Sequence, residues 1–420
     1  MAADELRGAA ARVRLDPVVT GSTTQSPARA GARGWTAVVL LAAAFAVAML
    51  GTTLPTPLYP DYQRLFGFGE LMTTVVFATY AVGVAAALLA FGRWSDQLGR
   101  RPMLLAGLAL SAVSALVFTF AGSTAWLFPG RVLSGLSAGI FTGTATAAVV
   151  DVAPAHGRAR ASLVAAAANM GGLGLGPLLA GVLAEYAPDR LRLCYLVDLG
   201  LVVLAVVAVL LVAEPVERAR HPRLGPQKIA VPAEMRGAFV RAGIAGFAGF
   251  AVLGLFTAVS PAFLGTVLHH TDRALVGVVV LALFAASTAG QVLSARLGER
   301  PAMVTGCAGL IAGMALIGVS LPLASLPVLL AGAVVAGLGQ GMGFRAGLTA
   351  LTAAAPAGQR GELTSSYFLV LYVGITLPVI GVGAATTAFG LVRSGVVFAA
   401  GVAVLAAVAL VLLLRRTGSR

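Results

Sequence analysis

The stretch GRWSDQLGRRP at residues 92–102 puts four charged side chains between two long apolar runs. They are Arg93, Asp96, Arg100 and Arg101. Acidic and basic side chains in such a stretch can make charged contacts with other parts of the chain, and contacts of this kind between two halves can break and re-form as the halves move. The chemistry is therefore that of a switchable contact, and its meaning depends on the elements around it.

Other patterns that resemble functional motifs have the wrong surroundings. GLSAG at 135–139 fits a nucleophile elbow, and GMGFRA at 341–346 mimics a dinucleotide fingerprint, but both lie within apolar runs that contain no strand signal. The four histidines have no metal-ligand spacing, and Cys194 and Cys307 lie in separate apolar runs. We expect no enzyme, no metal site and no bound cofactor.

Composition defines the elements that must position the charges. The chain has 420 residues, of which 59% are hydrophobic and 11% charged, against about 45–50% and about 25% in soluble domains. Apolar runs of helix-spanning length recur, without the alternation of a membrane barrel. We predict an all-α membrane protein with twelve transmembrane helices. The predicted spans are 35–58, 71–92, 103–122, 127–150, 162–184, 192–213, 242–265, 275–295, 302–321, 327–355, 363–389 and 394–414.

The basic residues follow membrane topology. The net charge is +13, but the arginines do not gather into one patch with exposed aromatics, so we expect no nucleic-acid partner. With the N-terminus inside, 22 lysines and arginines fall on the cytoplasmic side and five on the other. This asymmetry predicts that both termini are cytoplasmic. The bias towards arginine over lysine suggests a bacterial coding sequence, and hence an inner (plasma) membrane.

The two halves of the chain are related. LGRRP at 98–102 recurs as LGERP at 297–301, and APAHGRA at 153–159 recurs as APAGQRG at 355–361. We predict a disordered cytoplasmic tail (1–34), an N-terminal six-helix bundle (35–213), a cytoplasmic linker (214–241), a C-terminal six-helix bundle (242–414) and a second tail (415–420). Repeats at matching places imply pseudo-symmetric bundles with a substrate path between them.

The charged stretch resembles the loop signature of the major facilitator superfamily, a resemblance that covers nearly the whole chain. The matching residues are Gly92, Asp96, Gly99, Arg100 and Arg101. The resemblance implies a cytoplasmic gate in which Asp96 faces the N-terminal end of the eleventh span and Arg100 pairs with Asp151. The second copy has Ala295 in place of the aspartate, so the gate should be asymmetric. The alternative is that these charges serve topology alone.

Two further stretches resemble signatures of the same family. LFPGRVLSGLSAG at 127–139 matches the helix 4 signature through Arg131 and Gly135. An arginine inside a span is a functional-site hypothesis, although Arg131 lies near the outer end and could extend to the interface. GLGLGPLLAG at 172–181 is similar to the helix 5 signature that accompanies exporters. Its matching residues are Gly172, Gly176, Pro177 and Gly181.

Polar residues within the spans are candidates for coupling and binding. Asp198 is the one carboxylate clearly inside a span, at a depth similar to Arg131, so it could carry a proton, pair with Arg131 or reach the outer interface. Other polar side chains could line a central cavity or bond locally between helices. The cavity candidates are Thr53, Tyr80, Asn169, Gln291, Gln340, Arg345, Tyr367 and Tyr372.

These observations predict a monomeric secondary transporter that works by alternating access. The predicted activity is proton-coupled export of small amphiphilic or drug-like molecules, because a mostly apolar cavity suits them better than highly charged metabolites. One alternative is a proton-coupled or facilitative importer of sugars or other small metabolites. Another is a receptor or scaffold that does not transport. The expected partners are a small-molecule substrate, protons and the lipid bilayer.

Overall fold

The structure of the protein is a computed structural model that describes residues 27–216, 218–219, 221, 225–356 and 359–415. Most of the two predicted tails lies outside the described residues. Among the described residues, twelve helices are long and apolar enough to cross a membrane, and no strand is present. The predicted all-α fold with twelve spans is confirmed.

The N-terminal bundle contains six of these helices. They are α1 (Pro27–Thr53), α3 (Glu70–Phe91), α5 (Arg100–Thr119), α6 (Thr124–Asp151), α7 (Arg158–Tyr186) and α8 (Leu193–Leu211). The C-terminal bundle contains α9 (Arg236–Ala258), α11 (Arg273–Leu297), α12 (Glu299–Ser320), α13 (Leu326–Ala354), α14 (Arg360–Phe389) and α15 (Leu391–Leu414). Short helices connect them: α2 (Tyr59–Phe66), α4 (Trp94–Leu98) and α10 (Ser260–Ala262).

Some helices begin well before the predicted spans. The first begins at Pro27 rather than at 35, and the seventh begins at Arg236 rather than at 242. Hydropathy locates the part of a helix that lies in hydrocarbon, but the backbone hydrogen bonds continue into polar sequence beyond it. The linker between the bundles is shorter than predicted for this reason.

The two bundles repeat the same packing. In the N-terminal bundle α6 packs against α1, α3 and α5, while α1 packs against α7 and α8 and α5 against α8. In the C-terminal bundle α13 packs against α9, α11 and α12, while α9 packs against α14 and α15 and α12 against α15. Each pair in one list has its counterpart six spans later. This pseudo-symmetry explains the sequence repeats.

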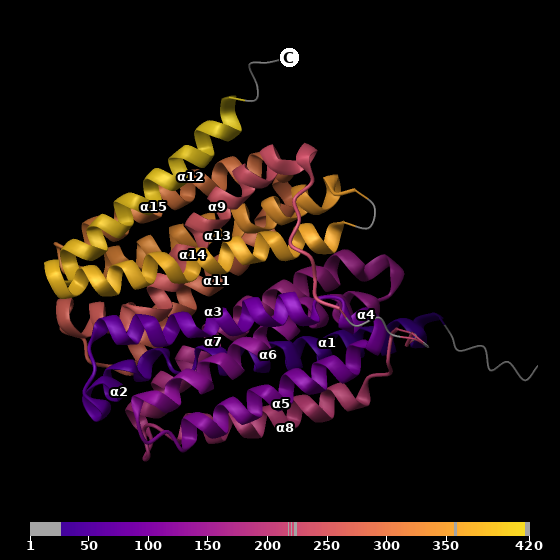
Figure 1. Ribbon diagram of the computed structural model, residues 1–420, viewed down its shortest axis with the longest axis horizontal. Helices are drawn as coiled ribbons and strands as arrows, with labels where there is room; N and C mark the ends of the chain where they lie inside the picture. Colours follow the sequence, from indigo (N-terminus) through magenta and orange to yellow (C-terminus); the bar gives the residue numbers. More distant parts are fainter. Residues whose placement is uncertain (1–26, 217, 220, 222–224, 357–358, 416–420) are drawn as a thin grey trace, which may run out of the picture.

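The bundles meet along two equivalent seams, as Figure 1 shows. One seam is α3 against α14 and the other is α7 against α11. Helices α8 and α15 lie on the outside, with many exposed apolar side chains such as Leu204 and Val404. Exposed apolar surface of this extent fits contact with lipid.

The two ends of the molecule have different connections. The linker and α4 lie at one end, here called the linker end (right-hand side of Figure 1). The opposite end, where α1 leads into α2 and α11 begins, is called the Arg273 end.

Candidate functional site

A small cavity lies at the centre of the molecule between the two bundles. Eight helices contribute to its lining: α1, α3, α6 and α7 from one bundle and α9, α11, α13 and α14 from the other. Helices α5, α8, α12 and α15 contribute none of the lining residues. The enclosed volume is about 40 Å³, room for a water molecule, whereas substrate sites hold ~300–1,000 Å³. The halves must therefore separate before a substrate fits.

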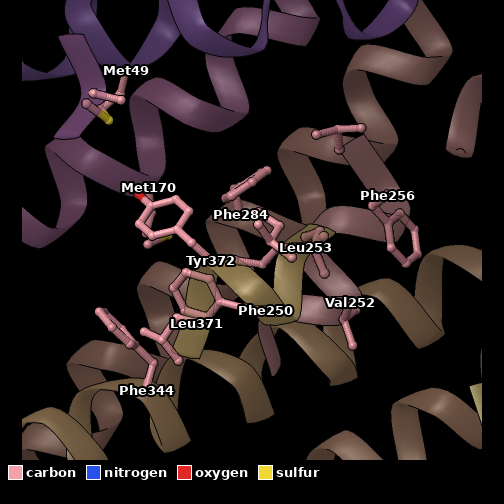
Figure 2. Close-up of a cluster of buried hydrophobic side chains, with 14 of the residues drawn as sticks. Met49, Met170, Phe250, Val252, Leu253, Phe256, Phe284, Phe344, Leu371 and Tyr372 are labelled. Carbon is pink, nitrogen blue, oxygen red and sulfur yellow. The ribbon is translucent and has the colours of Figure 1, made fainter. Parts of the chain in front are cut away.

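Aromatic and sulfur-containing side chains from both bundles form most of the wall. Figure 2 shows Met49 and Met170 of the N-terminal bundle facing Phe284 and Tyr372 of the C-terminal bundle. Tyr80 meets Tyr372 across the seam in an edge-on contact, with ring centroids 6.2 Å apart. Apolar and aromatic surface with few polar groups is typical of sites for small amphiphilic ligands.

Arg131 is the charged residue of this lining, and it is 2% exposed. Its guanidinium donates to the backbone carbonyl of Thr52 at 2.6 Å. Its Cζ atom lies 4.9 Å from the centroid of the Tyr80 ring and 5.4 Å from that of Phe77. The side chain therefore stays inside the bundle instead of extending to the interface, stabilised by cation–π contacts.

Glycines of α3 and α6 make this arrangement possible. A methyl group on Gly135 would collide with the backbone carbonyl of Tyr80, and one on Gly83 would collide with the backbone of Val132. The two helices therefore approach closely, as small residues permit in membranes. Gly135 of the helix 4 signature thus positions the Tyr80 ring beside Arg131.

The predicted cavity residues separate into two groups. Thr53, Tyr80, Asn169 and Tyr372 line the cavity. Gln340 is buried in the C-terminal bundle, where it accepts a hydrogen bond from Ser287 at 2.5 Å. Gln291 and Tyr367 are also buried, and Arg345 is partly exposed. These last four are not part of the described cavity lining.

Asp198 and Arg131 do not pair. Among the described residues no ion pair joins them, and they lie beside different residues of α1. Arg131 contacts the carbonyl of Thr52, whereas a methyl group on Gly51 would lie 3.0 Å from an Asp198 carboxylate oxygen and 3.2 Å from the Ser111 hydroxyl. Asp198 is 1% exposed, so it does not reach the interface either.

An ion-pair cluster joins the two bundles at the Arg273 end. Arg273 of α11 donates to both carboxylate oxygens of Asp61 in α2, at 2.7 Å each. It also donates to Glu185 at the end of α7, at 3.1 Å. The Arg273 and Asp61 side chains are each 13% exposed, so these pairs are better shielded than surface ion pairs. Sequence reasoning did not predict this contact, which joins residues 212 positions apart.

The helix 5 signature packs α7 against two partners. Methyl groups on Gly172 and Gly176 would collide with backbone carbonyls of α1, whereas one on Gly181 would collide with the carbonyl of Arg273 in α11. From the other side, a methyl group on Gly277 would lie 2.5 Å from the Cα atom of Leu178, next to Pro177. The signature therefore brings the bundles together beside the Arg273 ion pairs.

The charged stretch at the linker end forms contacts within the N-terminal bundle. Arg100 pairs with Asp96 at 2.5 Å and with Asp151 at 3.1 Å. Asp151 is the carboxylate that the family resemblance implies for Arg100. The Asp96 side chain is 64% exposed, and no ion pair or hydrogen bond among the described residues joins it to α14. The implied contact with the N-terminal end of α14 is thus not made in this structure.

Glu214 of the linker is a contact that sequence reasoning missed. Its carboxylate accepts from the backbone N–H groups of Arg100 and Arg101, at 2.8 and 2.9 Å. An anion at a helix N-terminus is favourable because unpaired N–H groups point towards it. Gly99 makes room: its φ is +100°, and a methyl group there would lie 2.7 Å from the Glu214 carboxylate.

The later part of the linker lies between α3 and α14. We call residues 225–232 the strap. The backbone N–H of Gln227 donates to the carbonyl of Leu89 in α3 at 2.6 Å. The Ser366 hydroxyl of α14, which donates to the Glu362 carbonyl at 2.8 Å, lies 3.4 Å from the carbonyl of Ala230. The Gln227 side chain also lies beside the first turn of α14, because a methyl group on Gly361 would lie 3.1 Å from its amide nitrogen.

Comparisons with known proteins agree with this architecture. A sequence model described as Major Facilitator Superfamily matches residues 41–318. Multidrug resistance protein 2 of Bacillus subtilis (strain 168) is 28% identical over 149 residues, 36% of this chain and 37% of that protein. Quinolone resistance protein NorA of Staphylococcus aureus (strain MRSA252) is 28% identical over 166 residues, 40% of this chain and 42% of that protein. The chain thus spans less than half the length of these curated relatives.

A solved structure is similar over almost the full length. It is a bacterial homologue of the human lysosomal transporter Spinster, in an inward-facing and unoccupied conformation. The TM-score is 0.71 at 17% identity, over 91% of this chain and 98% of that chain. At this identity the likeness concerns the fold, and it confirms the predicted arrangement of two six-helix bundles.

Proposed function

The chain belongs to the Major Facilitator Superfamily, and on this premise we propose that it exports small amphiphilic molecules in exchange for protons. Membership makes it a multi-pass membrane transporter and not an enzyme. Export, proton coupling and the substrate class are the proposal. The observation that carries it is the aromatic cavity between two bundles, which ion pairs of the described residues join at the Arg273 end.

The positive-inside asymmetry supports a cytoplasmic linker end. In that orientation, Arg273, Asp61 and Glu185 close the outer side, and the halves separate on the cytoplasmic side to admit substrate. Export then requires the three-residue cluster to break while the linker end closes. Two observations support this direction. The names of the relatives refer to multidrug and quinolone resistance, and residues 172–181 of this chain resemble the helix 5 signature that accompanies exporters.

Asp198 is the proposed proton carrier. A carboxylate that is 1% exposed and has no cationic partner among the described residues is costly to ionise in a membrane. It faces α1 at Gly51, one residue from the Thr52 carbonyl that binds Arg131. A shift of α1 would therefore change the surroundings of both groups, and this shared helix is a physical route for coupling proton release to substrate binding.

Proton movement in inverted membrane vesicles tests the proposal. Vesicles acidified inside receive a panel of lipophilic cations, weak acids, neutral amphiphiles and sugars, while a pH-sensitive dye reports protons leaving the lumen. We expect at least one amphiphilic class to release protons and sugars to release none. A response to sugars alone would instead favour a metabolite transporter. No response to any compound, with insertion verified, would contradict proton-coupled export.

Asp198→Asn should lower the substrate-induced proton release by about tenfold or more but leave substrate binding within about twofold. The amide has nearly the same shape as a protonated carboxyl group, yet it cannot exchange a proton. Asp189→Asn is the matched control, because Asp189 is exposed in the loop before α8. Normal proton release by Asp198→Asn would exclude this carboxylate as the carrier.

A further inference from the structure

We propose that the substrates are organic anions with an aromatic or otherwise apolar body, and that Arg131 binds their negative group. This inference rests on the proposed function, because it takes the central cavity as the transport site. It concerns the sign of the substrate's charge, which the fold alone does not determine.

The charges around the cavity have one sign. Eighteen residues line it, and Arg131 is the one ionisable cation or carboxylate among them. No aspartate or glutamate of the described chain belongs to this lining. A cationic substrate would meet a fixed positive charge without a compensating carboxylate, in surroundings where water is excluded and electrostatic interactions are strong. The cavity therefore disfavours lipophilic cations.

Arg131 has capacity to bind a further group. Its Nη1 donates to Thr52, but its Nε has no hydrogen-bond partner although it is buried. A guanidinium presents five N–H donors in a planar fork that suits a carboxylate, sulfonate or phosphate. Among the described residues Arg131 forms no ion pair. A buried cation in this condition is incompletely compensated, and an anionic ligand would complete its coordination.

The threonines of the lining are already engaged. Their hydroxyl groups donate to backbone carbonyls: Thr52 to Met49, Thr53 to Leu173, Thr142 to Ala138 and Thr257 to Leu253, at 2.6 to 2.9 Å. Few polar groups are left for the many hydroxyls of a sugar or for the full hydration shell of a small inorganic anion. The observed polarity therefore favours one anionic group on an otherwise apolar molecule.

The rest of the wall supplies the complementary apolar surface. Most of the aromatic rings in the wall belong to the C-terminal bundle, which lies opposite Arg131. The rings of this bundle are those of Phe250, Phe284, Phe344, Phe368 and Tyr372. A ligand held by Arg131 at its charged end would thus place its apolar body against the C-terminal bundle. Such a ligand contacts both halves at once and would favour their closure around it.

Two dyes that share a tricyclic ring system but differ in charge test the inference. Fluorescein is anionic, and tetramethylrhodamine methyl ester is cationic. Binding to the full-length protein in lipid nanodiscs is followed by fluorescence polarisation. We expect fluorescein to bind more tightly than the rhodamine ester. Arg131→Gln should weaken fluorescein binding by about 10- to 100-fold, as for loss of a hydrogen bond to a charged group, and should not weaken rhodamine binding.

Arg131→Lys tests how much of the binding comes from the positive charge alone. It keeps the positive charge without the planar fork, so we expect fluorescein binding between that of the wild type and that of Arg131→Gln. Arg64→Gln is the matched control, because Arg64 lies outside the cavity lining with an exposed side chain. Equal fluorescein binding by wild type and Arg131→Gln would overturn the inference.

Vesicle transport of the same dyes separates the two proposals. Movement of the rhodamine ester with exclusion of fluorescein would overturn the anion assignment and leave export in place. Movement of fluorescein that depends on Arg131 would support both. If neither dye nor any panel compound moved in vesicles with verified insertion, export itself would be overturned, and the anion assignment with it.

Discussion

Replacing Arg273 by glutamine is expected to open the Arg273 end of the transporter. The substitution removes the pairs to Asp61 and Glu185, the cross-bundle ion pairs of the described residues at this end. It also leaves the Glu185 carboxylate without this cation, whereas Asp61 keeps its pair with Arg64 within α2. Loss of a mostly shielded pair corresponds to about 2–3 kcal/mol, or a roughly 30- to 150-fold shift between closed and open populations.

Spin labels on Leu65→Cys and Phe389→Cys, one in each bundle and both exposed, would report this change in a background without Cys194 and Cys307. The label distance should lengthen in Arg273→Gln. Arg64→Gln is the control, since Arg64 pairs with the same Asp61 carboxylate from within α2 and does not cross between bundles. An unchanged distance distribution in Arg273→Gln would show that the cluster does not hold this end closed.

Gly181→Leu is expected to reduce transport to the background, a loss of more than about tenfold. Even a methyl group at this position would collide with the backbone carbonyl of Arg273, and backbone cannot give way as a flexible side chain can. The halves could then no longer close at the Arg273 end, so the cycle would stop with this end open.

Gly171→Leu is the matched control on the same helix. A methyl group on Gly171 meets nothing within 4 Å, so the change in helix propensity is the same without the collision. The spin-label pair at Leu65 and Phe389 should show the open distance in Gly181→Leu alone, and size-exclusion chromatography checks that both variants fold. Wild-type transport by Gly181→Leu would mean that α7 and α11 need not approach so closely.

The sequence was sufficient to predict the helices and their grouping. Twelve apolar runs and two pairs of repeated segments reflect requirements of the membrane and of the internal symmetry, and both are local or periodic signals. The pair of Arg100 with Asp151 was also implied, because a family resemblance relates two positions that are 51 residues apart.

Rotation about helix axes was not predictable. Arg131 and Asp198 have similar depths in their spans, but depth does not determine the direction in which a side chain points around its helix axis. The two side chains contact different residues of α1. The same limit applies to Gln291, Gln340 and Tyr367, which face packed helices instead of the cavity. Helices that are surrounded by lipid and protein are apolar on all sides. Their sequence pattern therefore does not show which side of the helix faces the cavity.

The Arg273 cluster was missed for a different reason. Asp61 and Arg273 are 212 residues apart, and each follows a turn in which a charged side chain would ordinarily be solvated. Nothing near either residue reveals that two bundles meet there. The contacts of the strap with α3 and α14 were likewise not predictable, because its composition alone indicates only a linker.

The strap has a consequence for the energetics of the transport cycle. A hydrogen bond from Gln227 to Leu89 ties it to the N-terminal bundle, and a longer contact of 3.4 Å between the Ser366 hydroxyl and the Ala230 carbonyl joins it to the C-terminal bundle. Any change in the separation of α3 and α14 at this end must stretch or release one of them. Release of one ordinary hydrogen bond costs about 1 kcal/mol, roughly a fivefold bias in a two-state equilibrium. The covalent connection between the halves thus contributes to the equilibrium between the two arrangements of the bundles at this end.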